Sequence, residues 1–95
     1  MALALLQFTV ADLQAFKEVF LDDLERRRGL GSVGARVFHS VTNENEITVL
    51  VDYGSTANAE QFSDSLQLHE AVKWASRGIV PEKIDVLEEV IDADA

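Results

Sequence analysis

Residues 32–53 read SVGARVFHSVTNENEITVLVDY, and this stretch determines how the rest of the chain is interpreted. The runs 32–41 and 46–53 are rich in β-branched and aromatic residues, which is typical of strands, and the polar residues 42–45 between them suit a turn. The stretch is therefore predicted to be a β-hairpin with two unlike faces. One face mixes polar and apolar groups and could meet a partner. The other is apolar enough to lie under helices and carries Val33, Ala35, Val37, His39, Val41, Ile47, Val49, Val51 and Tyr53.

The pairing of the two strands is predicted from the side chains that it would place opposite each other. The register that pairs Arg36 with Asp52 brings together opposite charges, and it also pairs small Ala35 with large Tyr53. Cross-strand pairs of these kinds stabilise antiparallel sheets. The hairpin is therefore expected to carry an ion pair between Arg36 and Asp52 on its mixed face.

The chain before the hairpin predicts a strand and a helix. Residues 3–10 are apolar at nearly every position, as in a strand that is covered on both faces. Asp12 suits the N-cap of a helix, and Gly29 is expected to take the left-handed conformation that ends it. The apolar stripe of this helix is Leu13, Phe16, Phe20 and Leu24, and its last turn holds Arg26, Arg27 and Arg28 at the negative end of the helix dipole.

The chain after the hairpin predicts two helical segments and a last strand. Ser55 and Ser65 suit the N-caps of the helical segments, with a break at residues 63–65. Residues 78–81, which include Gly78 and Pro81, are expected to end the second segment, and residues 83–91 supply the strand. The element order βαββαβ predicts an α+β, ferredoxin-like fold with a four-stranded antiparallel sheet. Residues 1–95 are interpreted as a single domain.

Composition limits the partners that the chain can have. The formal net charge of −9 argues against binding to nucleic acid or to an anionic membrane surface, which attract clustered Lys and Arg. The chain has no cysteine, and its apolar first residues lack the basic segment of a signal peptide, so we expect a cytoplasmic protein. A domain of 95 residues leaves much of its surface in water, so association into a homodimer through the mixed sheet face would stabilise it.

The residues around these elements resemble the dimeric α/β-barrel superfamily, which includes antibiotic biosynthesis monooxygenase-like proteins and small polyketide cyclases. The resemblance covers nearly the whole chain. It rests on residues 8–12 leading into 16–20, on residues 37–39 with the turn and 47–51, and on Gly54 and Ser55 before a helix. It implies that two sheets face each other in a dimer. It also implies a cavity between sheet and helices for an aromatic or polyketide-like ligand.

Two histidines are the candidate catalytic groups, because only their side chains have an unperturbed pKa near neutrality. His39 lies on the apolar face of the hairpin, and His69 lies in the second helical segment. Either could act as a general base on a substrate that forms a stabilised carbanion. A lone histidine at such a position is, however, more often a core or surface residue.

Four further residues are candidate substrate-binding groups. Trp74 and Tyr53 are the only tryptophan and tyrosine, and each could hold a flat ligand, although such residues more often fill a core. Trp74 and Asn58 are the nearest analogues of the aromatic residue and the amide that the resemblance to cofactor-independent monooxygenases implies. Arg36 could hold a carboxylate or enolate if the cavity opens on the mixed face.

Neither a metal nor a cofactor is expected. The two histidines are far apart in sequence, and no Gly-rich loop precedes a helix to hold a nucleotide.

Three functions stay open. The first is a small cofactor-independent monooxygenase or cyclase acting on an aromatic or polyketide-like substrate. The second is a non-catalytic dimer that binds a small apolar ligand or assists a neighbouring enzyme, and the third is a stress-related structural dimer with a filled core.

Overall fold

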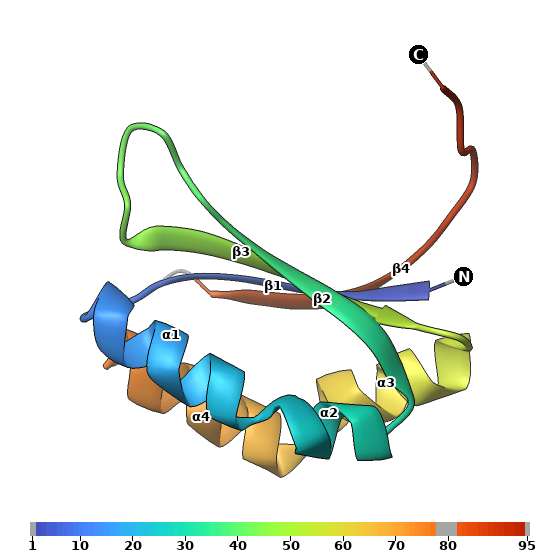
Figure 1. Ribbon diagram of the computed structural model, residues 1–95, viewed down its shortest axis with the longest axis horizontal. Helices are drawn as coiled ribbons and strands as arrows, with labels where there is room; N and C mark the ends of the chain where they lie inside the picture. Colours follow the sequence, from blue (N-terminus) through green and yellow to red (C-terminus); the bar gives the residue numbers. More distant parts are fainter. Residues whose placement is uncertain (1, 78–81, 95) are drawn as a thin grey trace.

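A four-stranded antiparallel sheet with all its helices on one face forms the protein, as the computed structural model shows for residues 2–77 and 82–94 (Figure 1). The strands lie in the order β2-β3-β1-β4, so the predicted ferredoxin-like arrangement is confirmed. In chain order the elements are β1 (Ala2–Thr9), α1 (Leu13–Asp22), α2 (Leu24–Gly29), β2 (Ser32–His39), β3 (Glu46–Tyr53), α3 (Thr56–Asp64), α4 (Leu66–Ser76) and β4 (Lys83–Glu88).

The core lies between the sheet and the helices. Alternate residues of the two central strands point toward the helices, as strand geometry requires. From α1, α3 and α4, residues such as Phe16, Phe62, Leu68 and Val72 pack against them and are buried. The strand residues buried on this side of the sheet are Ala2, Ala4, Leu6 and Phe8 on β1 and Ile47, Val49, Val51 and Tyr53 on β3.

Three predicted helix starts are confirmed by side-chain hydrogen bonds. The carboxylate of Asp12 accepts from the backbone N–H of Ala15 at 3.1 Å. The hydroxyls of Ser55 and Ser65 accept in the same way from the third residue after each, both at 3.2 Å. Each cap satisfies a backbone donor that has no partner within the helix. The predicted end of α4 at residues 78–81 lies outside the described residues.

The first helical segment differs from the prediction because it is broken at Asp23. The backbone N–H of Asp23 is shared between the carbonyls of Val19 and Phe20, at 3.2 and 3.3 Å, which tightens the turn and starts α2 in a new direction. Leu24, predicted to be in the apolar stripe, is 42% exposed, and Arg27 is buried instead. The left-handed residue is Gly31, with φ of 94°, and not Gly29 as predicted.

The hairpin register also differs from the prediction. Arg36 lies opposite Leu50, and Asp52 lies opposite Gly34, so among the described residues no ion pair joins Arg36 to Asp52. The displaced register already holds next to the turn, where the backbone N–H of Ser40 donates to the carbonyl of Glu46 at 2.9 Å, and an irregularity between Ser32 and Gly34 shifts it by one further residue at the far end. From Gly34 to His39 the register is displaced by two residues, so these side chains keep their predicted face, whereas the irregularity places Ser32 opposite Tyr53.

Strand β2 is less covered than predicted. Val33 is 69% exposed, and Val41 lies beyond the strand and is 98% exposed. Val37 and His39 do point to the side of the helices, but a hollow separates them from α1. Strand β2 is an edge strand whose main helix contact is with the short α2, whereas β4, at the other edge, is covered by α3, so the residues of β2 gain little cover.

The last strand is shorter than predicted. Strand β4 ends at Glu88, which pairs with Ala2 at the start of β1, so β1 offers no further described residue for pairing. Residues 89–94 continue as an irregular tail, in which Val90 and Ile91 are 90% and 81% exposed. In Figure 1 this tail rises on the side of the sheet opposite the helices.

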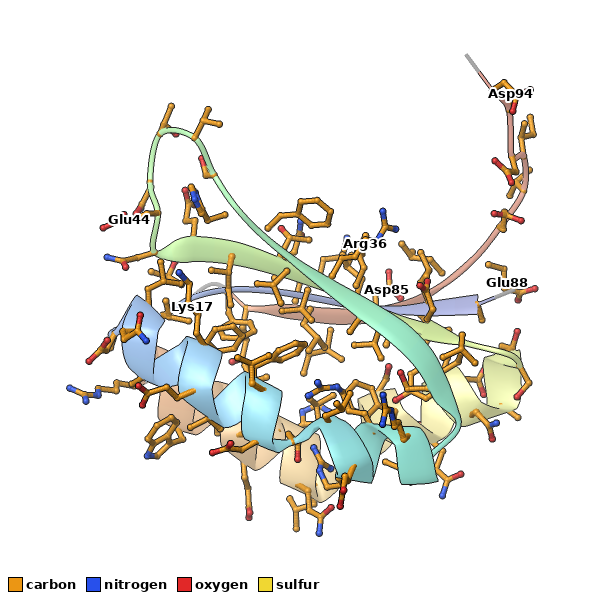
Figure 2. The ribbon with its side chains drawn as sticks, in the orientation of Figure 1. Lys17, Arg36, Glu44, Asp85, Glu88 and Asp94 are labelled. Atoms are coloured by element: carbon orange, nitrogen blue, oxygen red, sulfur yellow. The ribbon has the colours of Figure 1, made fainter. Side chains whose placement is uncertain are left out.

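We call the side of the sheet without helices the open face. Figure 2 shows Arg36 on this side. Among its apolar members Leu5 is only 9% exposed, whereas Phe38 and Leu87 are 47% and 38% exposed. The open face consists of Leu3, Leu5, Gln7, Arg36, Phe38, Thr48, Leu50, Asp52, Lys83, Asp85 and Leu87.

Candidate functional site

A cleft of about 220 Å³ lies between the sheet and the helices. Its floor is formed by β1 and β3, one wall by α1 and α2, and the other wall by α4. This volume exceeds the roughly 150 Å³ of an engineered apolar cavity that binds benzene. The residues that line it are Leu6, Phe8, Phe16, Val19, Phe20, Asp23, Arg26, Arg27, Val49, Phe62, Gln67, Leu68, Ala71, Val72, Trp74 and Ala75.

Aromatic rings stiffen the α1 wall of the cleft. Phe16 meets Phe8 edge-on and stacks on Phe20, with 5.7 Å between ring centroids in both pairs. Aromatic pairs in these geometries are favourable beyond the burial of their area. The cleft is therefore bounded by fixed rings that suit a flat apolar ligand.

Contacts at two places fix the direction of the cleft. At one end, the backbone N–H of Ala11, just before α1, donates to the carbonyl of Ala75 at 3.0 Å. At the other end, Arg26 of α2 donates to the side chain of Gln67 at 3.1 Å. The segment α1–α2 therefore runs antiparallel to α4, as Figure 1 shows, and the cleft lies between them.

Trp74 stands at the end of the cleft near the start of α1. Its side chain is 58% exposed while it also lines the hollow, so part of the indole remains in contact with water. An amphipathic ring in this position can cover one end of a bound molecule.

Arg27 lies at the other end of the cleft and is 3% exposed. Its Nη1 donates to the backbone carbonyl of Phe20 at 2.8 Å, and its guanidinium carbon lies 3.9 Å from the centroid of the Phe20 ring. Its Nε is buried and has no hydrogen-bond partner among the described residues. A buried cation with an unused donor is unusual, because burial of a charge is costly unless its groups are paired.

Asp23 is shared unequally between two arginines. Its two carboxylate oxygens accept from Nε and Nη2 of Arg26 at 2.7 and 2.8 Å, whereas Nη1 of Arg27 is 3.7 Å away. The hydrogen bonds that Arg26 donates to Asp23 raise the pKa of Arg26, and burial lowers the pKa of Arg27. Both guanidinium groups remain protonated near neutral pH, so this cluster of three residues carries a net charge of about +1.

Tyr53 adds a second buried polar group behind the cleft. Its ring lies 5.5 Å from that of Phe62, and its hydroxyl has no hydrogen-bond partner among the described residues. Burial raises the pKa of Tyr53 to about 12, against the opposing influence of Arg26 and Arg27. The phenol is therefore a neutral donor at physiological pH.

The two candidate catalytic histidines lie outside the cleft. Nδ1 of His39 is 2.9 Å from the carbonyl of Ser40, and its ring lines a second apolar hollow of about 250 Å³ between α1 and β2. Nε2 of His69 is 2.8 Å from the carbonyl of Ser63. Only N–H can donate to a carbonyl, so in the neutral form the other ring nitrogen of each histidine is left as the base.

The candidate substrate-binding residues are not brought together. Trp74 lines the cleft, and Tyr53 is buried behind it. Arg36 lies on the open face, and Asn58 lies at the start of α3 beside Gly31. The structure thus does not assemble the six predicted residues into one site.

Arg27 and Asp23 were not predicted as functional residues, although the sequence carries a signal for Arg27. It lies three residues after Leu24 and seven after Phe20, so it continues the apolar stripe at helical spacing. We interpreted it only as one of three arginines at a helix end.

Within residues 2–77 and 82–94, no group of three or more His, Asp or Glu side chains is placed to hold a metal ion. The helices of the described chain are also too short or too polar to cross a membrane.

No family model matches the chain, and no curated protein matches it. Its fold, however, is shared with several solved structures. One is SnoaB from Streptomyces nogalater, a cofactor-independent oxygenase, with a TM-score of 0.72, 12% identity, and coverage of 99% of this chain and 97% of that chain. The fold is that of the antibiotic biosynthesis monooxygenase-like proteins.

Two further structures support this assignment of the fold. A putative antibiotic biosynthesis monooxygenase from Caulobacter crescentus has 21% identity and a TM-score of 0.68, and the alignment covers 95% of this chain and 90% of that one. The protein Rv0793 from Mycobacterium tuberculosis has 14% identity and a TM-score of 0.69, with 98% of each chain covered. The resemblance seen in the sequence is therefore confirmed at the level of the fold.

Proposed function

We propose that this protein is a small cofactor-independent monooxygenase or cyclase-like enzyme that acts on an aromatic or polyketide-like substrate in the cleft. The observation that carries this proposal is the cleft itself, which is walled by aromatic and aliphatic side chains and has positive charge at one end. The fold that it shares with SnoaB, a cofactor-independent oxygenase, adds support. A core filled by side chains, as in a structural dimer, would leave no such hollow.

The proposed oxygenation needs few catalytic groups. A tricyclic anthrone loses a proton from its central CH₂ carbon to a base and becomes an enolate. The enolate gives one electron to O₂, and the resulting radical and superoxide combine and take up a proton to form a hydroperoxide. Loss of water then leaves a quinone, so that one substrate and one O₂ yield one quinone and one H₂O. The protein contributes by positioning the substrate and stabilising the enolate in an apolar site.

His39 and His69 are the proposed bases, and because neither lines the cleft, the reacting carbon of a bound substrate would have to reach beyond it. His39 lines the second hollow together with Phe16 and Phe20, which also line the cleft. His69 follows the cleft residue Leu68 on α4. We expect His39→Ala or His69→Ala to lower the turnover number of the enzyme, and full turnover in both variants would exclude these two residues as bases.

Oxygen uptake with anthrone tests the proposal. The wild-type protein is expected to consume O₂ and form anthraquinone without an added metal or cofactor, faster than the buffer alone. Ala75→Phe, which places a ring in the cleft, should reduce the rate to that of the buffer. Ala57→Phe, an exposed substitution on α3 outside the cleft, serves as the control and should retain the wild-type rate. Equal rates with and without protein would contradict an oxygenase function on this substrate class.

A non-catalytic binding protein is the alternative, because the same cleft could hold an apolar ligand without changing it. Recovery of bound anthrone unchanged after incubation in air would favour this alternative.

We also propose that two copies associate through the open face. This face carries the apolar side chains Leu3, Leu50 and Leu87 next to charges of both signs, such as Arg36 and Asp85, so it can pair with itself about a two-fold axis. The exposed Val90 and Ile91 of the tail extend on the same side and would gain cover from a second copy (Figure 1).

A further inference from the structure

We infer that the natural occupant of the cleft carries an ionised oxygen, as a carboxylate, phenolate or enolate, and that Arg27 holds this end of the molecule. The inference rests on the proposed function because it names the substrate class of the same cleft. It is carried by three observations: the charge of the cluster, the unused donor of Arg27, and the shape of the cleft.

The charge at this end of the cleft is unbalanced. Arg26 and Arg27 share only Asp23, whose two oxygens are both engaged by Arg26. This excess of positive charge is buried in a chain whose formal net charge is −9. Acidic residues are plentiful, yet within the described residues only Asp23 forms an ion pair with these arginines. An anionic ligand would supply the missing negative charge.

The guanidinium of Arg27 is held in place with one donor group free. Phe20 receives the Nη1 hydrogen bond through its carbonyl and covers a face of the guanidinium with its ring. The buried Nε has no partner among the described residues. Arginine presents its donors in a rigid planar fork, so fixing one edge on Phe20 also fixes the direction in which Nε can donate. The same Nε is shielded from solvent, so an oxyanion would reach this donor only when a side chain that covers it moves aside.

The length of the cleft indicates what the rest of the ligand is. Along α4 the cleft runs from Gln67, beside Arg26, to Trp74. Seven residues of helix at 1.5 Å each give a length of roughly 10 Å. Between the two ends the walls are apolar, with Phe16, Leu68 and Val72 among them. The occupant is therefore expected to be a flat ring system of two or three fused rings, with its charged oxygen at Arg27 and its far ring at Trp74.

The experiment compares two ligands that differ only in charge. The dissociation constants of 2-naphthoate and of the neutral 2-naphthamide are measured by isothermal titration calorimetry at neutral pH and low salt. The wild-type protein is expected to bind 2-naphthoate roughly tenfold to a hundredfold more tightly, as for a charge-assisted hydrogen bond in a buried site.

Variants assign this preference to Arg27. Arg27→Gln should abolish the preference, whereas Arg28→Gln, which removes an equal charge from an exposed residue of the same turn, should keep it. Asp23→Asn should increase it, because it removes the one carboxylate beside Arg27. This second variant tests the inference in the opposite direction if Arg27→Gln fails to fold.

The outcomes separate the inference from the proposed function. Equal affinity for both ligands in the wild-type protein would overturn the inference while the cleft remained a binding site. A preference that survives in Arg27→Gln would also overturn it, because the anion would be held elsewhere. Failure of both ligands to bind, together with no oxygen uptake with anthrone, would overturn the proposed function as well.

Discussion

The guanidinium of Arg27 lies 3.9 Å from the centroid of the Phe20 ring and donates to the carbonyl of the same residue at 2.8 Å. One residue of α1 thus holds the buried cation through both its side chain and its main chain. The carbonyl of Phe20 belongs to the last turn of α1, where carbonyls lack full partners within the helix, so Arg27 also caps this helix. The position of the charge is therefore fixed before any ligand binds.

Removal of Asp23 is expected to cost more stability than removal of the charge on Arg27. Asp23→Ala leaves two neighbouring guanidinium groups without a carboxylate, and should lower the free energy of unfolding by about 1–3 kcal/mol. Arg27→Met removes a buried charge and keeps an apolar side chain, so the loss should be below about 1 kcal/mol. Urea denaturation of both variants measures the difference, and the reverse order would show that Arg27 is required mainly for stability.

Tyr53→Phe is expected to leave the fold unchanged and to stabilise it slightly. The hydroxyl of Tyr53 is buried without a hydrogen-bond partner among the described residues. Its removal relieves the cost of an unmade hydrogen bond, about 1 kcal/mol. Urea denaturation at neutral pH checks this value. A loss of stability above about 1 kcal/mol would show that the hydroxyl is in fact paired.

The same residue predicts how stability changes at alkaline pH. The pKa of Tyr53 is raised to about 12 in the folded protein, and that of an unfolded tyrosine is about 10. Above about pH 10 the unfolded chain loses this proton and the folded protein keeps it, so the stability of the wild-type protein should fall relative to Tyr53→Phe up to about pH 12. Tyr53 is the only tyrosine, so the tyrosinate absorbance of the folded protein reports its ionisation directly. A midpoint near 10 would contradict its burial.

Gly31→Ala is expected to destabilise the protein, unlike Gly29→Ala. Gly31 has φ of 94°, and an added Cβ would lie 2.7 Å from Nδ2 of Asn58. Strain and close contact together should cost about 1–3 kcal/mol. Gly29 lies in α2 and has open space around it, so alanine there should be neutral or stabilise by up to about 1 kcal/mol. Thermal unfolding of the two variants checks this, and equal melting temperatures would contradict the turn described for Gly31.

A charge placed in the middle of the open face is expected to break the proposed dimer. Leu50→Arg puts a cation on this face opposite Arg36, so two copies could no longer bury it without cost. Leu66→Arg, which changes a 72% exposed leucine on α4, is the control and should leave the mass unchanged. Light scattering after size exclusion gives the masses. A monomeric wild-type protein at micromolar concentration would contradict the proposal.

The order of elements could be predicted from the sequence because each signal was local. Asp12, Ser55 and Ser65 cap helices through their own side chains, and the alternation of β3 placed Ile47 and Val49 in the core. The register of β2 could not be predicted in this way. It is set at the turn, where the backbone N–H of Ser40 donates to the carbonyl of Glu46 at 2.9 Å, and no cross-strand pairing rule reveals this.

The candidate site was harder to predict because it depends on tertiary packing. The break at Asp23 leaves Leu24 exposed, whereas a continuous helix would place Leu24 on the apolar stripe together with Arg27. The histidines were chosen by their pKa, yet packing places both outside the cleft. Trp74 was chosen for its flat side chain, and it does line the cleft.

The fluorescence of Trp74 during a titration with anthrone under nitrogen tests the central claim most directly. Trp74 is the only tryptophan and lines the cleft, so a ring system bound there must contact it or change its surroundings. We predict saturable quenching with one site per chain, and its loss in Ala75→Phe. Emission that stays unchanged up to the solubility limit of anthrone, or that changes equally in Ala75→Phe, would contradict a binding site in this cleft.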